Sequence, residues 1–69
     1  MVTIKEAATG VLVEGTGFRE TFRNRFKAFM AAHAVALGEA AATGTPVTIV
    51  VPAGWGEPVI IEPIMRLAA

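Results

Sequence analysis

The side chains with the clearest capacity for chemistry are basic ones that recur at every fourth position. Arg19, Arg23 and Lys27 have this spacing, which would place them in a single row along one flank of a helix. Such a row could contact the phosphates of a nucleic acid. The net charge of zero opposes this interpretation, because nucleic-acid-binding domains usually carry a basic excess. A solvated helix flank is the simpler interpretation.

A second candidate site is the segment Gly15-Thr16-Gly17, which precedes the expected helix. Free amides at a helix N-terminus, together with Arg19, could attract an anion. However, the third glycine of a dinucleotide-binding loop and the lysine of a nucleoside-triphosphate-binding loop are both missing. Two glycines around a helix cap more often indicate only a tight turn.

His33 is the only histidine, and the sequence contains neither cysteine nor aspartate. One chain therefore cannot assemble a metal site or a catalytic triad around it. We expect a neutral imidazole bonded to a backbone carbonyl, or a pair of His33 side chains at a symmetry axis. Glu14, Glu57 and Glu62 fall on separate expected elements, and nothing pairs them as an acid and a base. The sequence predicts no catalytic residue, metal or cofactor, and we expect a protein that is not an enzyme.

Trp55 is the remaining candidate, and it stands between two glycines in a loop bounded by prolines. A tryptophan held on a short, constrained loop loses little conformational entropy on docking and is typical of interface hot spots. The alternative is that Trp55 folds back over the end of its own core.

One long helix, residues 18–42, is expected to position most of these side chains. An apolar stripe with spacings of three and four residues predicts it, and its members are Phe18, Phe22, Phe26, Phe29, His33, Ala36 and Ala40. Thr16 or Gly17 would cap its start, and Gly44 is the preferred end because Gly38 is followed by strong helix formers.

The second half of this helix is apolar on every side, with no charged residue from Ala28 to Gly38. A helix of this kind is normally buried all round, and a short chain has few other elements to enclose it. We therefore expect a second molecule to cover it, with Ala32, Ala36 and Ala40 allowing another helix to approach closely. The predicted interface consists of Trp55, Ala28, Ala31, Ala32, Ala34, Val35, Ala36 and Leu37.

Short β-branched runs predict strands on both sides of the helix. These runs are residues 2–5, 11–14, 47–51 and 59–64, with a turn at residues 7–10 and a loop at residues 52–58. The expected fold is α+β with a ββαββ order, in which two hairpins form an antiparallel sheet and the helix packs across it.

The amino-acid composition limits the remaining possibilities for domain number and location. The 69 residues suit a single domain, residues 1–69, and they are 54% hydrophobic and 17% charged, which is more apolar than a typical small domain. The uncharged stretch in the helix is shorter than the roughly 17–25 residues of a membrane span. No signal peptide is recognisable, so we expect a cytoplasmic location or a place within an assembled virion.

These observations favour a non-catalytic structural subunit that associates with copies of itself or with a larger protein assembly, such as the accessory or decoration protein of a viral capsid. A small oligomeric nucleic-acid-binding module using Arg19, Arg23 and Lys27 is the first alternative. A ligand-binding oligomer or enzyme with a site between subunits, near His33 or the Gly15–Gly17 turn, is the second.

Overall fold

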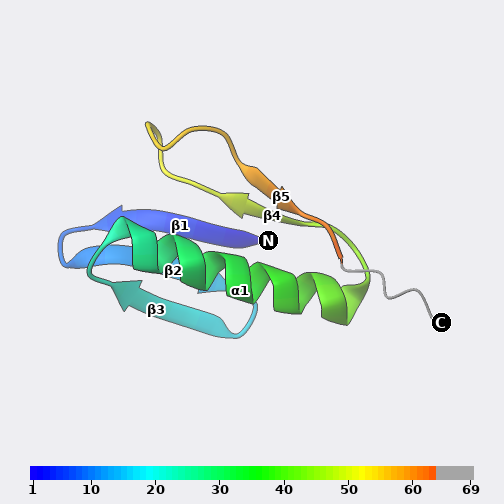
Figure 1. Cartoon of the computed structure of the whole chain (residues 1–69). Helices are drawn as coiled ribbons and strands as arrows, with labels where there is room; N and C mark the ends of the chain where they lie inside the picture. The colour runs from blue at the N-terminus through cyan, green and yellow to red at the C-terminus, as the bar shows by residue number, and fades with distance from the viewer. Residues whose placement is uncertain (64–69) are drawn as a thin grey trace.

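A computed structural model describes residues 1–63 as five strands and one helix (Figure 1). The strands form one sheet in the order β3-β2-β1-β4-β5. In chain order the elements are β1 (Val2–Ala7), β2 (Gly10–Gly15), β3 (Phe18–Phe22), α1 (Arg25–Thr43), β4 (Val47–Val50) and β5 (Val59–Ile61). Ile64, the expected last position of the final strand, lies outside the described residues, as do residues 65–69, which the sequence predicts to be a short tail.

The α+β class with one helix laid across a sheet is confirmed, but the sheet is mixed, and a purely antiparallel arrangement is wrong. β1 pairs antiparallel with β2 and parallel with β4. The position of the helix explains this difference. The amino group of Met1 lies 3.5 Å from the Glu39 carboxylate near the end of α1, and β4 begins shortly after the same end. Both strands therefore start at the same side of the sheet and run in one direction.

The predicted start of the helix is wrong, because Phe18–Phe22 is a strand. Its register with β2 runs from Gly15 opposite Phe18 to Val11 opposite Phe22. Thr16 and Gly17 form the turn between the two strands, with Gly17 at a positive φ of 72°. A two-residue hairpin turn commonly requires such a φ, which glycine adopts without steric cost.

The helix has caps at both ends that its sequence specifies. At the start, the side chain of Asn24 accepts a hydrogen bond from the Lys27 backbone N–H at 2.8 Å, as an N-cap residue does. At the end, Gly44 adopts a left-handed conformation with φ 68°, and its N–H donates to the Ala40 carbonyl. Gly44 is the predicted stop, and the helix passes through Gly38 without interruption.

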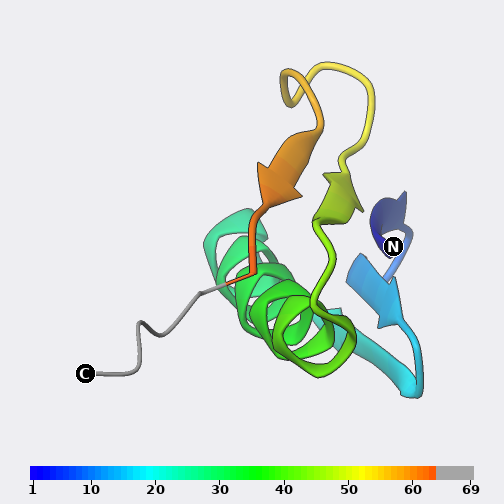
Figure 2. The same ribbon diagram turned by 90° about the vertical axis from the view of Figure 1, so that its right-hand side faces the viewer.

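The core lies between the helix and one face of the sheet, and it combines small helix residues with branched strand residues. The fully buried helix positions are Ala28, Ala32, Ala36 and Ala40. The buried strand residues are Val2, Ile4, Val11, Val13, Val47 and Ile49. Alanine at every fourth position lets the helix backbone lie close to the branched side chains. Figure 2 shows the helix on one side of the strands, with the opposite side of the sheet uncovered.

The face of the sheet that the helix does not cover carries two ion pairs that share Glu14. Glu14 lies between Lys5, at 3.4 Å, and Arg19, at 3.6 Å, on three neighbouring strands. Exposed pairs of this kind contribute little to stability, but they indicate a face in contact with water. Within residues 1–63, no helix is long and apolar enough to cross a membrane.

Glu39 connects the helix to two other parts of the chain, and we expect its replacement to destabilise the fold. Its carboxylate accepts a hydrogen bond from the Thr16 N–H at 3.0 Å and lies near the Met1 amino group. The structure leaves room for this contact only because residue 15 is a glycine, since a Cβ there would come within 2.7 Å of a Glu39 oxygen.

Glu39→Ala should lower the free energy of unfolding by about 1–2 kcal/mol, since hydrogen bonds to charged groups are stronger than neutral ones and this one is partly screened by solvent. Urea denaturation followed by circular dichroism measures the change. Glu57→Ala, in an exposed loop, is the control. Equal stability of the two variants would show that the Glu39 contacts contribute nothing.

Candidate interaction surface

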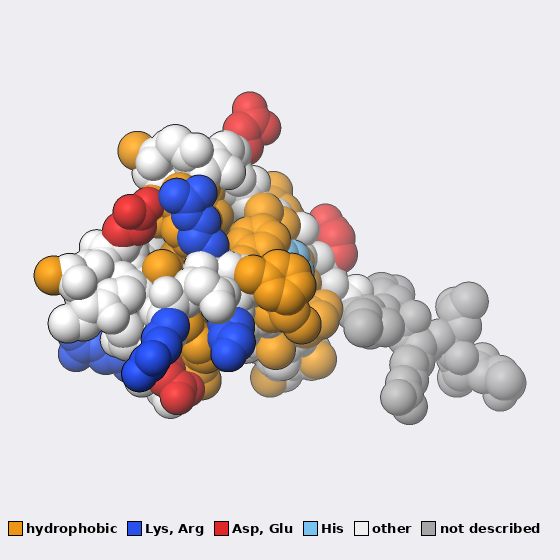
Figure 3. All heavy atoms as spheres, turned by 60° about the vertical axis from the view of Figure 1, so that its left-hand side comes forward, with side chains coloured by type: hydrophobic (Ala, Val, Ile, Leu, Met, Phe, Trp, Pro, Cys, Tyr) orange, Lys and Arg blue, Asp and Glu red, His pale blue; other side chains and the backbone are white. Residues whose placement is uncertain are grey.

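The most distinctive surface feature is a stripe of apolar side chains along the helix, on the flank of its buried alanine row. Phe26 is 73% exposed, Met30 58% and Leu37 40%, and the half-buried His33 lies between the last two along the chain. We call Phe26, Met30, His33 and Leu37 the helix stripe. Figure 3 shows hydrophobic side chains gathered over one side of the molecule, with basic side chains beside them.

The members of the helix stripe follow one another at intervals of four, three and four residues. This is the spacing of the residues that meet along the seam between two packed helices. The only charged residue between positions 26 and 38 is Lys27, which lies about 100° around the helix from Phe26. The stripe is thus an uncharged ridge with the periodicity of a helix-pairing seam.

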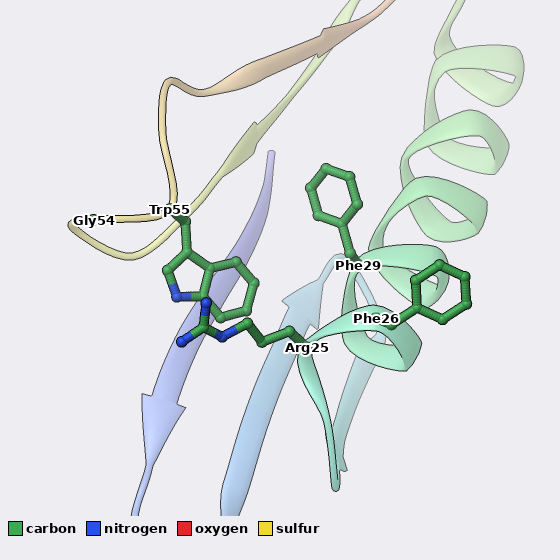
Figure 4. A pocket seen from close by; sticks show the side chains of 5 residues that line it. All are labelled: Arg25, Phe26, Phe29, Gly54 and Trp55. Carbon is green, nitrogen blue, oxygen red and sulfur yellow. The ribbon is translucent and has the colours of Figure 1, made fainter.

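Next to the start of the helix stripe is an open groove of about 420 Å³, which we call the Trp55 groove. Its lining residues are Arg25, Phe26, Phe29, Gly54 and Trp55. The first three come from the beginning of α1, and the last two come from the loop between β4 and β5 (Figure 4). Its walls are mainly aromatic, with one guanidinium at the edge.

Trp55 is fixed in the groove by contacts on two sides. Its indole N–H donates to Oε1 of Glu6 at 2.6 Å, and the guanidinium carbon of Arg25 lies 5.2 Å from the centre of its ring, within the range of a cation–π interaction. Its backbone N–H also donates to the Pro52 carbonyl, which closes a turn. The half-buried indole packs against the core, so the fold-back interpretation holds for part of its surface while the rest faces the groove.

His33 makes the backbone contact expected for it. Nδ1 lies 3.1 Å from the Phe29 carbonyl oxygen, and since a carbonyl can only accept, this nitrogen carries the hydrogen. The imidazole also meets the Phe29 ring edge to face, with 4.5 Å between ring centres. Within residues 1–63, no three His, Asp or Glu side chains are grouped closely enough to hold a metal ion.

The structure separates the predicted interface residues into two groups. Ala28, Ala32 and Ala36 are fully buried against the chain's own sheet, so they have no surface to offer a partner. The predicted close approach of another helix along Ala32, Ala36 and Ala40 is wrong, because the chain's own sheet occupies that side of the helix. The others keep some exposed surface: Ala31, Ala34, Val35, Leu37 and Trp55. For these residues an interface remains a prediction.

The predicted basic row does not exist as a helix flank. Arg19 lies in β3, Arg23 lies between β3 and α1, and only Lys27 is helical. Arg19 is also engaged by Glu14. The expected anion site at Gly15–Gly17 likewise lacks a helix N-terminus, because those residues connect two strands. The nucleic-acid alternative therefore loses the spacing argument on which it was based.

Three contributors to this surface were missed in the sequence. The sequence interpretation places Phe26 in the apolar stripe of the expected helix and gives Arg25 and Glu6 no role. An available signal was Asn24, a favoured N-cap residue followed by an apolar and basic run. Starting the helix there places Arg25 and Phe26 in its first turn, beside the loop that carries Trp55.

These features define a small α+β protein with a five-stranded mixed sheet, one covering helix and an exposed aromatic and apolar surface at the helix. The chain matches no protein-family model, no curated protein and no solved structure.

Proposed function

We propose that this protein is a non-catalytic building block that associates with a second copy of itself through the helix stripe. The observation that carries the proposal is the exposure of Phe26, Met30 and Leu37 at helix-pairing intervals. Burying such side chains yields roughly 25 cal/mol per Å² of apolar surface removed from water. A second copy presents the same uncharged ridge, so the surface is complementary to itself.

An antiparallel pairing of two helices is the arrangement that best buries the helix stripe. A two-fold axis between Met30 and His33 brings Phe26 opposite the partner's Leu37, and Met30 opposite the partner's His33. The Lys27 side chains of the two copies would start about 13 Å apart along the seam, beyond the distance at which exposed charges interact strongly in physiological salt. The two Lys27 side chains therefore do not repel each other strongly in this arrangement.

Participation in a larger particle, such as the accessory or decoration layer of a viral capsid, is the wider form of this proposal. The small size and zero net charge of the chain support it, together with a surface that is apolar along one helix. Paired subunits would be the unit that such a particle uses.

The test is the molar mass in solution, measured by light scattering after size exclusion. We expect the wild-type protein to have twice the 7.2 kDa mass of the chain at high micromolar concentration, and Met30→Glu to have the mass of one chain, because a carboxylate would be buried unpaired in the seam. Ala42→Glu places the same charge on the exposed helix surface outside the stripe and should leave the dimer intact. A monomeric wild-type protein, or a dimeric Met30→Glu variant with unchanged circular dichroism, would contradict the proposal.

A further inference from the structure

Arg25 forms no ion pair with an acidic side chain among residues 1–63, although Glu6 contacts the same indole ring. The ion pairs of the described chain join Glu39 to Met1 and Glu14 to Lys5 and Arg19, and Glu6 is engaged by the Trp55 indole. The guanidinium carbon of Arg25 instead lies 5.2 Å from the centre of the Trp55 ring. This cation–π contact holds the guanidinium near the indole while its N–H donors remain available at the edge of the Trp55 groove.

The electrostatics of this end of the helix favour a negative ligand. The first turn of α1 contains no acidic residue and carries Arg25 and Lys27, which are both unfavourable beside the positive end of the helix dipole. Positive charge at this position does not stabilise the helix, and a bound anion would compensate it. The guanidinium fork matches the geometry of a carboxylate in particular.

The groove also offers an apolar site next to this cation. Phe29 and Trp55 form its walls, Phe26 is largely exposed at its margin, and its volume of about 420 Å³ suits a single large side chain with adjoining backbone. The indole is held by Glu6 and by the turn at Pro52, so the site is formed before a ligand arrives and little ordering is needed.

We propose that the Trp55 groove binds an acidic peptide segment of another protein, in which a carboxylate lies next to a large apolar side chain. The apolar side chain enters between Phe29 and Trp55, and the carboxylate accepts from the Arg25 guanidinium. A nucleic acid fits less well, because the Glu6 carboxylate, which accepts from the indole N–H, would repel a continuous polyanion. This inference does not rest on self-association, since all the residues that line the groove come from one chain, and Phe26 at its margin is the one residue that it shares with the helix stripe.

Trp55 is the only tryptophan, so its fluorescence reports on the groove directly. Four blocked peptides serve as probes, namely acetyl-Ser-Glu-Phe-Ser-amide and its variants with Gln for Glu, Ala for Phe, and both changes. We expect the Glu-Phe peptide to shift the Trp55 emission saturably. Each single change should weaken binding about tenfold, as the loss of one charge-assisted contact or one buried side chain implies.

Arg25→Met should weaken the Glu-Phe peptide about tenfold and abolish its advantage over the Gln-Phe peptide, whereas Arg23→Met, which removes an equal charge outside the groove lining, should change neither. Arg25→Lys keeps the positive charge but removes the bidentate geometry of the guanidinium. This variant should bind the Glu-Phe peptide more tightly than Arg25→Met and more weakly than the wild-type protein. Circular dichroism of each variant confirms the fold.

Equal affinity of the Glu and Gln peptides for the wild-type protein would overturn the carboxylate assignment, and this comparison needs no variant. An oligothymidylate that binds more tightly than every peptide, with an affinity that falls steeply with salt, would overturn the assignment in favour of a nucleic acid. The absence of a saturable shift with any peptide would remove the groove as a binding site. The dimer mass would be unaffected by any of these results, so failure here is distinguishable from failure of the proposed self-association.

Discussion

Replacing Ala32 with Leu is expected to lower the free energy of unfolding by about 2–3 kcal/mol, because extra methylenes inserted into a well-packed core force displaced side chains and backbone. Ala32 is fully buried in the middle of the alanine row that faces the sheet. The core cluster that contains Ala32 also contains branched strand residues that are themselves fully buried, including Ile4 and Ile49. Leucine is a good helix former, so the loss cannot come from helix propensity.

Ala42→Leu is the matched control, since it makes the same substitution at an exposed helix position outside the predicted interface. Its effect should stay within about 0.5 kcal/mol. Urea denaturation, followed by circular dichroism and by Trp55 fluorescence at one fixed protein concentration, measures both variants. The concentration is fixed because association would make the apparent stability depend on it. Equal stability of the two variants would mean that the helix does not lie on the sheet through its alanine row.

The second large effect is expected from Ile4→Ala, which should cost about 2–5 kcal/mol through lost apolar contact and the cavity left behind. Ile4 lies on the central strand β1, between β2 and β4, and it is among the largest fully buried side chains. A chain of this length is expected to have a total stability of only about 3–10 kcal/mol. The variant should therefore be partly or wholly unfolded at room temperature.

Ile60→Ala makes the identical change on β5, where the side chain is 62% exposed. We expect Ile60→Ala to lower the free energy of unfolding by less than about 1 kcal/mol, because most of the Ile60 side chain is already in contact with water in the folded protein. Thermal denaturation of both variants at equal concentration compares them. A larger loss at position 60 than at position 4 would place the core on the opposite face of the sheet, or would indicate that a partner covers Ile60.

The sequence predicted the strands and turns well where several local signals agreed. The runs at residues 2–5, 11–14 and 47–51 each contain or closely match an observed strand, because alternating or β-branched residues are bounded there by turn residues. Gly44 was predicted as the helix end for a similarly local reason, since a left-handed C-cap favours glycine.

The start of the helix could not be read from the phenylalanine spacing. Phe18 and Phe22 are four residues apart, and this interval returns to the same face in a helix and also in a strand. The two-residue turn at Thr16-Gly17 and the cap at Asn24 resolve the ambiguity in favour of a strand. The parallel pairing of β1 with β4 was equally out of reach, because it depends on where the helix returns the chain.

The sequence by itself determined the α+β class, a helix ending at Gly44 and an apolar excess on that helix. Only the tertiary structure decided which side of the helix is buried. From Ala28 to Gly38 nearly every residue is apolar, so hydrophobicity alone cannot distinguish one face from another. The sheet selects the face by size: alanines permit close contact with its valines and isoleucines, while Phe26, Met30 and Leu37 are left toward solvent. Steric fit between two elements is a property of their packing, and no local pattern in the chain specifies it.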